Sequence, residues 1–330
     1  RKSIMNQTEE IKDVKDLKAG DIIVFQVPKD CFTSKLIARL THSDVSHAAL
    51  CYKDGACPEL ADSSDDGLHR HKISAGSRGA YIRRLVNVEN QADLAPVLAV
   101  AKKYVDMNMD YPMADLYMLG VLVLYKNFSE GGIRQTIILN LLKVITAAIK
   151  TRWETTRYEG KHPMICSEYV FQCYNEASKE NPSLALELRG GDLQPEVRFL
   201  NSNAPASLLD AFIINSKNNC DFNLELSEED DAPTQSVEEL ASLALADLDS
   251  TNGPLQLEWN GSMHRAVLDF LRTIQEVKGM AFNTIEELIE NAIRQRAYFV
   301  TPNDLKVHIA NVADLGMIGI YRDPAIVTDA

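Results

Sequence analysis

The sequence predicts an α+β protein, with a mixed first part up to about residue 190 and a mostly helical part after it. Short β-branched and aromatic runs bounded by turns indicate strands within the first 90 residues. Apolar residues at helical spacing dominate most later stretches. The chain of 330 residues exceeds one ordinary domain, and its 45% hydrophobic and 25% charged residues are typical of a folded soluble protein.

The elements of the first part follow from local patterns. A turn at 16–21 precedes a buried strand at 22–25, and a second strand at 46–52 ends in the hairpin-type turn Lys53-Asp54-Gly55. Apolar spacing predicts helices at 34–40 and 93–105. Two further strands are expected at 60–62 and 81–88. The stretch His69-Arg70-His71 is interpreted as a surface loop rather than a metal site, because no Cys or carboxylate stands at ligand spacing.

Residues 113–158 form a basic, apolar segment in an acidic protein. The ten residues 116–125 are almost wholly apolar, too few for the ~18 that span a bilayer. Six basic residues against three acidic ones give the segment a net charge of +3. Two interpretations stay open. The segment is either a helical hairpin packed on the protein's own core or at a dimer interface, or a lipid-facing lid with flanking cations that suit peripheral membrane contact.

The last part of the chain is acidic and helical. Residues 221–252 hold ten acidic residues and no basic one, and 221–235 is predicted to be a solvated linker. Capping boxes at 236–239 and 284–287 predict helix starts. The predicted division is therefore a domain over 16–190, with 113–158 as an insertion, and a region over 191–330 whose stretch 300–321 returns to pack on the first domain.

Charge and motifs exclude several function classes. The net charge of −13 disfavours binding to nucleic acid, and six cysteines are too few for a disulfide scaffold. The sequence has no Walker loop, no dinucleotide-binding glycine pattern and no His-Glu-x-x-His, so no cofactor and no metal are expected. The first 15 residues do not resemble a signal peptide, but the compartment and the oligomeric state stay open.

One cysteine stands where a nucleophile is favoured. Cys166 follows Pro163 and opens a predicted helix, so its thiolate would lie among free backbone N–H groups and the positive end of the helix dipole. The same N–H groups could hold an oxyanion. His47, on a predicted strand, could serve as the base, with a carboxylate behind it to fix its tautomer. Because a lone Cys or His is usually structural, spacing alone does not decide the matter.

Four strings in this order resemble a known family. They are GDIIVFQ at 20–26, THSDVSH at 41–47, LAD at 60–62 and ICSEYV at 165–170. Together they resemble the permuted papain-like cysteine hydrolases of the NlpC superfamily, in particular the YiiX-like group. In that group the cysteine helix follows the histidine strand, the reverse of ordinary papain-like enzymes. The resemblance covers about residues 16–177, and it implies an antiparallel sheet or small barrel packed against helices.

The resemblance also implies roles for individual residues. Cys166 would be the nucleophile and His47 the base. Asp62 would orient the histidine, although the group usually has Glu there, and Glu59 is the fallback. Four further residues are expected to line the cleft: Ser43, Asp44, Ser167 and Tyr111.

The predicted function is that of a cysteine hydrolase acting on an amide bond. The resemblance favours a peptide or cell-wall-type peptide of a bacterium as substrate. A lipid esterase, phospholipase or acyltransferase would use the same pair of residues, because both chemistries pass through a thioester. A non-catalytic binding module with a blocked cleft is the alternative outside enzymology.

Overall fold

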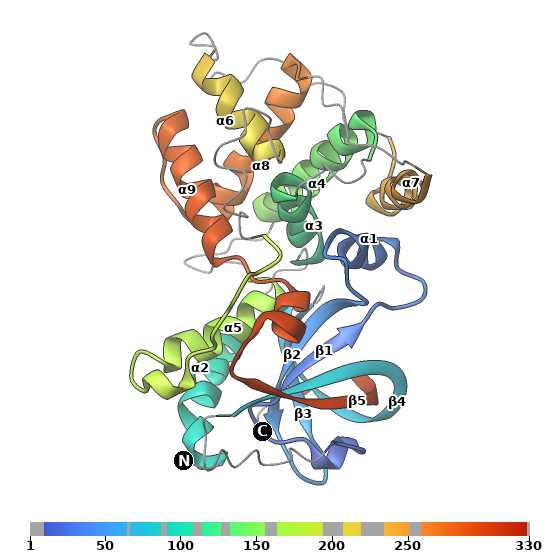
Figure 1. Cartoon of the computed structure of the whole chain (residues 1–330), viewed down its shortest axis with the longest axis vertical. Coiled ribbons are helices and arrows are strands. Elements are labelled where there is room, and N and C mark those ends of the chain that lie inside the picture. The colour runs from blue at the N-terminus through green and yellow to red at the C-terminus, as the bar shows by residue number, and fades with distance from the viewer. Residues whose placement is uncertain are drawn as a thin grey trace, which may run out of the picture.

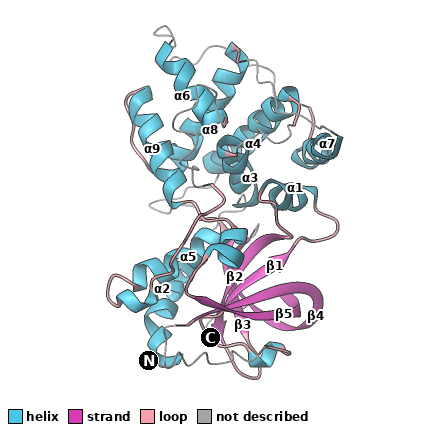
Figure 2. Cartoon of the chain, viewed as in Figure 1, coloured by secondary structure: helices cyan, strands magenta, loops and turns pink. Residues whose placement is uncertain are grey.

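The structure is a computed structural model that describes residues 10–64, 67–86, 91–107, 114–126, 133–155, 164–193, 207–218, 234–250 and 259–328. Figure 1 shows two layers stacked along the long axis, with the strands in one layer and a group of helices in the other. Figure 2 shows the same division by secondary structure. The protein is therefore α+β, with an antiparallel sheet packed against helices, as the sequence predicts.

The sheet is antiparallel and closes on itself. Neighbouring strands pair in the order β1-β2-β3-β4-β5, and β1 also pairs with β4. The closure is possible because β4 is 19 residues long, so that its first half pairs with β3 and its second half with β1. The strands are β1 (Ile22–Gln26), β2 (Val45–Lys53), β3 (Glu59–Ser64), β4 (Gly67–Leu85) and β5 (Val312–Ile326).

The length of β4 corrects one sequence prediction. We expected a strand at 81–88 and a loop at 69–71, but β4 already begins at Gly67. Residues 67–80 include three Gly, two Ala and one Lys, which have weak strand propensity. They are extended because β3 pairs with their first half and β5 with most of their length. Tertiary pairing therefore overrides the local signal.

Two helices, α2 and α5, belong to the layer of the sheet. α5 packs on β2 and β3, and α2 packs on α5. The buried face of α5 includes Tyr169, Val170 and Cys173. The remaining short elements of this part are single helical turns. The helix α1 packs on α3 and α7 of the second layer. The helices are α1 (Phe32–Leu40), α2 (Ala95–Asp106) and α5 (Cys166–Ala177). The short elements are η1 (Val14–Asp16), η2 (Gln91–Leu94), η3 (Pro182–Leu184) and η5 (Asp304–His308).

The second layer combines helices from two distant stretches of chain. α4 packs on α7 and α8, and α3 packs on α4 and α6. The described helices of the insertion at 113–158 therefore pack on helices after residue 207, a contact that the predicted boundary near residue 190 does not include. The helices are α3 (Ala114–Tyr125), α4 (Gln135–Thr155), α6 (Leu208–Asn218), α7 (Val237–Ser250), α8 (Gly261–Val277) and α9 (Ile285–Tyr298).

The same packing bears on the first interpretation of the apolar segment, a helical hairpin packed on the protein's own core. α3 is apolar on every side and buried over nearly its whole length, as expected for a helix inside a core. One face of α4 is also buried, and it consists of Ile137, Ile138, Leu141, Leu142, Ile145 and Ile149. These buried side chains belong to the protein's own core. Among the described helices none has the length and apolarity needed to span a membrane.

The end of the chain completes the sheet. β5 pairs along most of β4, so residues 312–326 lie beside a strand that is more than 200 residues earlier in sequence. The stretch 208–298 is consequently inserted between the first part and its last strand. Residues 221–233 of the predicted acidic linker lie outside the described residues.

Candidate active site

Cys166 is fixed by a short extended segment that leads into α5. Ile165 has extended backbone, with φ −73° and ψ 162°, and the helix begins at the cysteine. Ser63 on β3 donates a hydrogen bond of 2.8 Å to the carbonyl of Met164, which ties this segment to the sheet. No side chain caps the helix N-terminus, so the first-turn N–H groups are not occupied by a capping side chain. The cysteine side chain itself is fully buried.

His47 lies between Cys166 and a buried carboxylate. It stands on β2 opposite Phe25 of β1. Its Nε2 is 2.6 Å from Oδ2 of Asp62, on the neighbouring strand β3. The histidine side chain also has a hydrogen bond with Cys166. Nε2 is bound to Asp62, so the contacts run from Asp62 through His47 to Cys166 and leave Nδ1 as the other ring nitrogen.

The charges in this line stabilise one another. Burial alone would lower the pKa of His47, but the negative charge of Cys166 and the hydrogen bond with Asp62 raise it to about 10. Burial would raise the pKa of Asp62, but the hydrogen bond and charge of His47, with Arg322 behind them, lower it to about 2. At neutral pH the arrangement therefore favours an imidazolium beside the ionised carboxylate of Asp62.

Asp62 has further partners that sequence reasoning missed. Nη1 of Arg322, on β5, lies 2.6 Å from the same Oδ2 and 3.2 Å from the hydroxyl of Ser64. His71, fully buried on β4, places Nε2 4.0 Å from Oδ1 of Asp62, while its Nδ1 is 3.0 Å from the carbonyl of Asp323. The carboxylate is thus surrounded by basic side chains from three strands. The burial of His71 also corrects the prediction of a surface loop at 69–71.

The fallback carboxylate, Glu59, lies elsewhere. It is three residues before Asp62 on the same strand, and an odd spacing along a strand places side chains on opposite faces. Its carboxylate pairs with Lys53 at 3.4 Å and with Arg70 at 3.7 Å. Asp62, and not Glu59, is therefore the carboxylate beside His47.

The four residues expected to line the cleft have different surroundings. Ser167 is fully buried, and its hydroxyl donates to the carbonyl of Val300 at 2.7 Å, so it serves packing between the layers. The hydroxyl of Ser43 donates to the carbonyl of Val45 at 3.1 Å within the turn before β2. Tyr111 lies outside the described residues.

Asp44 is exposed and bound to three neighbouring side chains. It accepts hydrogen bonds from Gln26 at 3.1 Å, from Tyr81 and from Lys306. Burial alone would raise its pKa, but these hydrogen bonds lower it to about 2, so the carboxylate is ionised at neutral pH. Asp44 thus links β1, β4 and the chain just before β5 on the surface of the sheet layer.

A second polar cluster lies between the layers. Oxygens of Asp192 and Asp304 and a nitrogen of His308 all lie within 4.8 Å of one another, a spacing that a metal ion could use. Each carboxylate already accepts hydrogen bonds from protein donors: Asp304 from the backbone N–H of Asp192 at 2.7 Å and from His308 at 2.8 Å, and Asp192 from Asn303 at 3.0 Å. The cluster is therefore explained by its own hydrogen bonds.

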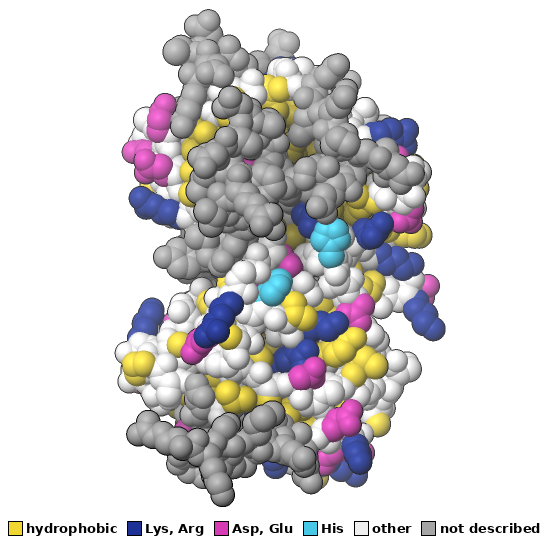
Figure 3. All heavy atoms as spheres, viewed as in Figure 1, with side chains coloured by type: hydrophobic (Ala, Val, Ile, Leu, Met, Phe, Trp, Pro, Cys, Tyr) yellow, Lys and Arg dark blue, Asp and Glu magenta, His cyan; other side chains and the backbone are white. Residues whose placement is uncertain are grey.

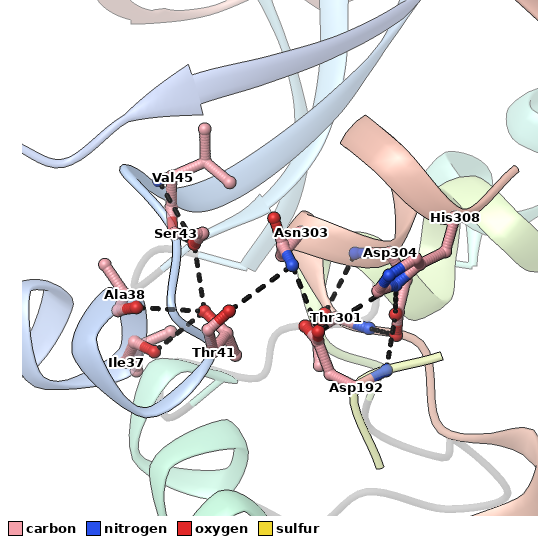
Figure 4. Close-up of polar contacts among 10 residues, drawn as sticks. All are labelled: Ile37, Ala38, Thr41, Ser43, Val45, Asp192, Thr301, Asn303, Asp304 and His308. Atoms are coloured by element: carbon pink, nitrogen blue, oxygen red, sulfur yellow. Dashed lines mark hydrogen bonds and ion pairs between the residues drawn. The ribbon is translucent and has the colours of Figure 1, made fainter. Parts of the chain in front are cut away.

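Figure 4 shows where this cluster lies relative to the turn before β2. Asn303 stands between Asp192 and the carbonyl of Thr41, to which it donates at 3.3 Å. The hydroxyl of Thr301 donates to Asp192 at 2.6 Å from the other side. The cluster joins the chain before β5 to the turn that leads to His47. In the space-filling view of Figure 3, histidine side chains lie at the narrow region between the two layers.

The comparisons with known proteins leave the family open. No protein-family model matches the chain, and no curated protein is significantly similar to it. The resemblance to permuted papain-like hydrolases therefore depends on the four sequence strings alone.

The geometry is suited to one kind of chemistry. A thiol lies at a helix N-terminus, a histidine lies beside it, and a buried carboxylate holds that histidine, an arrangement of the kind used in nucleophilic catalysis. The cysteine is fully buried, whereas 13% of the His47 side chain is exposed. The imidazole is thus the member of the pair that solvent reaches in this structure.

Proposed function

We propose that the protein is a cysteine hydrolase that cleaves amide bonds through Cys166, His47 and Asp62. The observation that carries this proposal is the line of contacts from Asp62 through His47 to Cys166 at the start of α5. A histidine that only filled the core would need neither a buried carboxylate on one side nor a thiol on the other.

The reaction would proceed through an acyl-enzyme. The thiolate of Cys166 attacks the carbonyl carbon, a C–S bond forms, and the oxyanion lies against the first N–H groups of α5. Protonated His47 then gives its proton to the leaving amine as the C–N bond breaks. Next, His47 removes a proton from water, which attacks the thioester and releases the acid and the thiolate. Asp62 keeps Nε2 bound throughout, so that Nδ1 faces the reacting atoms.

Two features bear on the substrate. The amide preference rests on the resemblance to hydrolases of peptides and cell-wall-type peptides. Lipid esters and acyl transfer are the alternative, because they would use the same thioester. The burial of α3 and of one face of α4 in the protein's own core supports the amide, because these apolar side chains pack inside the protein.

The complete burial of Cys166 favours a competing function, a binding module whose cleft is closed. Peptide mapping after iodoacetamide treatment separates the two. If the protein is a hydrolase, iodoacetamide should modify Cys166 faster than Cys173. Cys173 is buried on the same helix, and burial raises the pKa of its thiol. Equal, slow modification of both thiols would favour the binding module.

Intact-mass detection of acyl adducts tests the hydrolase directly. The chain is incubated with a panel of peptides and phospholipids, and a mass increase that maps to Cys166 identifies the acyl donor. Cys166→Ala should lose both adduct and turnover while it keeps the melting temperature within a few degrees. Cys173→Ala is the matched control, because it removes a thiol from the same helix and should stay active. Turnover by Cys166→Ala would refute the mechanism.

A further inference from the structure

Arg78 stands next to the candidate active site at an irregular point of the sheet. The register between β4 and β5 shifts between Ala75 and Arg78, and such bulges redirect side chains. The Nε of Arg78 donates to the carbonyl of Gln26 at 3.0 Å. Its guanidinium carbon lies 4.8 Å from the centre of the Phe25 ring, and that ring is 5.9 Å from the ring of His47. The arginine is therefore stacked one ring away from the histidine.

The two arginines near the site are used differently. Arg322 is bound to Asp62 and Ser64. Arg78 uses only Nε with a protein acceptor among the described residues, which leaves the N–H groups of both terminal nitrogens for another acceptor. Burial and the nearby charge of Arg322 lower the pKa of Arg78 and so disfavour its charged form. The negative charges of Asp62, Asp115 and Cys166 favour the charged form but do not outweigh these effects. A partly buried guanidinium in this situation would gain from a bound anion.

We propose that Arg78 binds an anionic group of the substrate, a carboxylate or a phosphate, beside the bond that is cleaved. This inference rests on the proposed hydrolase function, because it assigns a substrate class to the same site. The two terminal nitrogens present parallel N–H groups that match two oxygens of either anion. Arg78 would then select substrates by charge, while His47 and Cys166 perform the chemistry.

Two alkylating reagents that differ in charge test the proposal. Iodoacetate carries a carboxylate and iodoacetamide is its neutral counterpart. With either reagent the sulfur attacks the methylene carbon, a C–S bond forms and iodide leaves. The rate of each reaction at Cys166 is followed by peptide mapping in the full chain. The ratio of the iodoacetate rate to the iodoacetamide rate reports attraction of the anion, separately from the reactivity of the thiol.

The expected result is a charge-selective loss. In Arg78→Gln the ratio should fall about tenfold, the order expected when a unit charge is removed beside a partly desolvated anion. In Arg78→Lys, which keeps the positive charge, the ratio should stay close to that of the unaltered chain. Arg39→Gln is the matched control, because Arg39 is an exposed guanidinium on α1 that pairs with Asp249, and its ratio should not change. Melting curves confirm that each variant is folded. If Arg78→Gln is not folded, protection of Cys166 by small anions in the unaltered chain carries the test.

Protection by small anions identifies the chemistry. Acetate or inorganic phosphate should slow the iodoacetamide reaction at Cys166 in the unaltered chain but not in Arg78→Gln. Protection by acetate indicates a carboxylate substrate, and protection by phosphate indicates a phosphate ester. An unchanged ratio in Arg78→Gln, or protection by neither anion, would overturn the role of Arg78. The hydrolase proposal would still stand in that case if Cys166 is reactive. A Cys166 no more reactive than Cys173 would overturn both.

Discussion

Replacing Asp62 with Asn probes the candidate active site most directly. The two side chains have nearly the same shape, so the change removes the charge and leaves the packing. In the structure this charge serves both His47 and Arg322, each at 2.6 Å from the same oxygen. Asp62→Asn should therefore lower both the free energy of unfolding and the reactivity of Cys166.

The size of the stability loss follows from the pKa of Asp62. That pKa is lowered from 3.8 to about 2, which corresponds to about 2 kcal/mol of stability at neutral pH. Because the folded-state pKa is the lower one, this contribution is fully present above about pH 4 and is lost as the pH falls toward 2. Urea unfolding should show a difference of about 2 kcal/mol between the two proteins at pH 7, and about half of that at pH 3.

Reactivity gives the second measurement. Without the carboxylate, His47 is a weaker partner for the thiolate, and the amide of Asn can hold the imidazole in the wrong tautomer. We expect iodoacetamide to modify Cys166 at least about tenfold more slowly at pH 7, and turnover of any substrate to fall by about 10²–10⁴-fold. Modification of Cys166 at the unaltered rate, in a folded Asp62→Asn protein, would show that Asp62 does not position the histidine.

Two further predictions use neighbouring side chains. Glu59→Gln removes the other buried carboxylate of β3, which contacts Lys53 and Arg70 rather than His47. The rate at which iodoacetamide modifies Cys166 should therefore stay within about twofold of the unaltered rate, and a larger drop would show that Glu59 acts on the candidate site. The pKa of His47 is raised to about 10, so its contribution to stability is complete below about pH 6.5 and is lost as the pH rises toward 10. The stability difference between the unaltered chain and His47→Gln should accordingly shrink from pH 6.5 to pH 10 in urea unfolding, and a difference that grows over this range would contradict the assigned contacts.

The parts of the site that could be predicted from sequence are those with local signals. The helix start at Cys166 and the strands around His47 follow from residue patterns, and their order supports the resemblance. The choice of Asp62 over Glu59 follows from the alternation of side chains along a strand, but only once both are known to lie on β3. Before that, the resemblance favoured Asp62 but kept Glu59 as the fallback.

The remaining partners depend on pairing between distant strands. Arg322 is 260 residues from Asp62 in sequence, and nothing near it marks it as a partner. His71 stands in a stretch of weak strand propensity that becomes a strand only between β3 and β5. The packing of α4 on α7 and α8 was not predicted for the same reason, because local periodicity identifies helices but does not show which of them pack together.

The late position of β5 in the chain has a consequence for the site. His47, Asp62 and Cys166 all lie within the first 166 residues, yet the arginine that binds Asp62 arrives on the last strand, after the whole helical insertion. Val300 accepts the hydrogen bond of Ser167 next to Cys166, and Lys278 pairs with Glu168 at 2.9 Å. The cysteine helix and the carboxylate are thus both held by residues beyond position 277. The first part alone keeps the contact between His47 and Asp62, but it lacks Arg322 behind the carboxylate and the two contacts that hold α5. The full arrangement of Asp62, His47 and Cys166 therefore depends on the helical layer and the final strand.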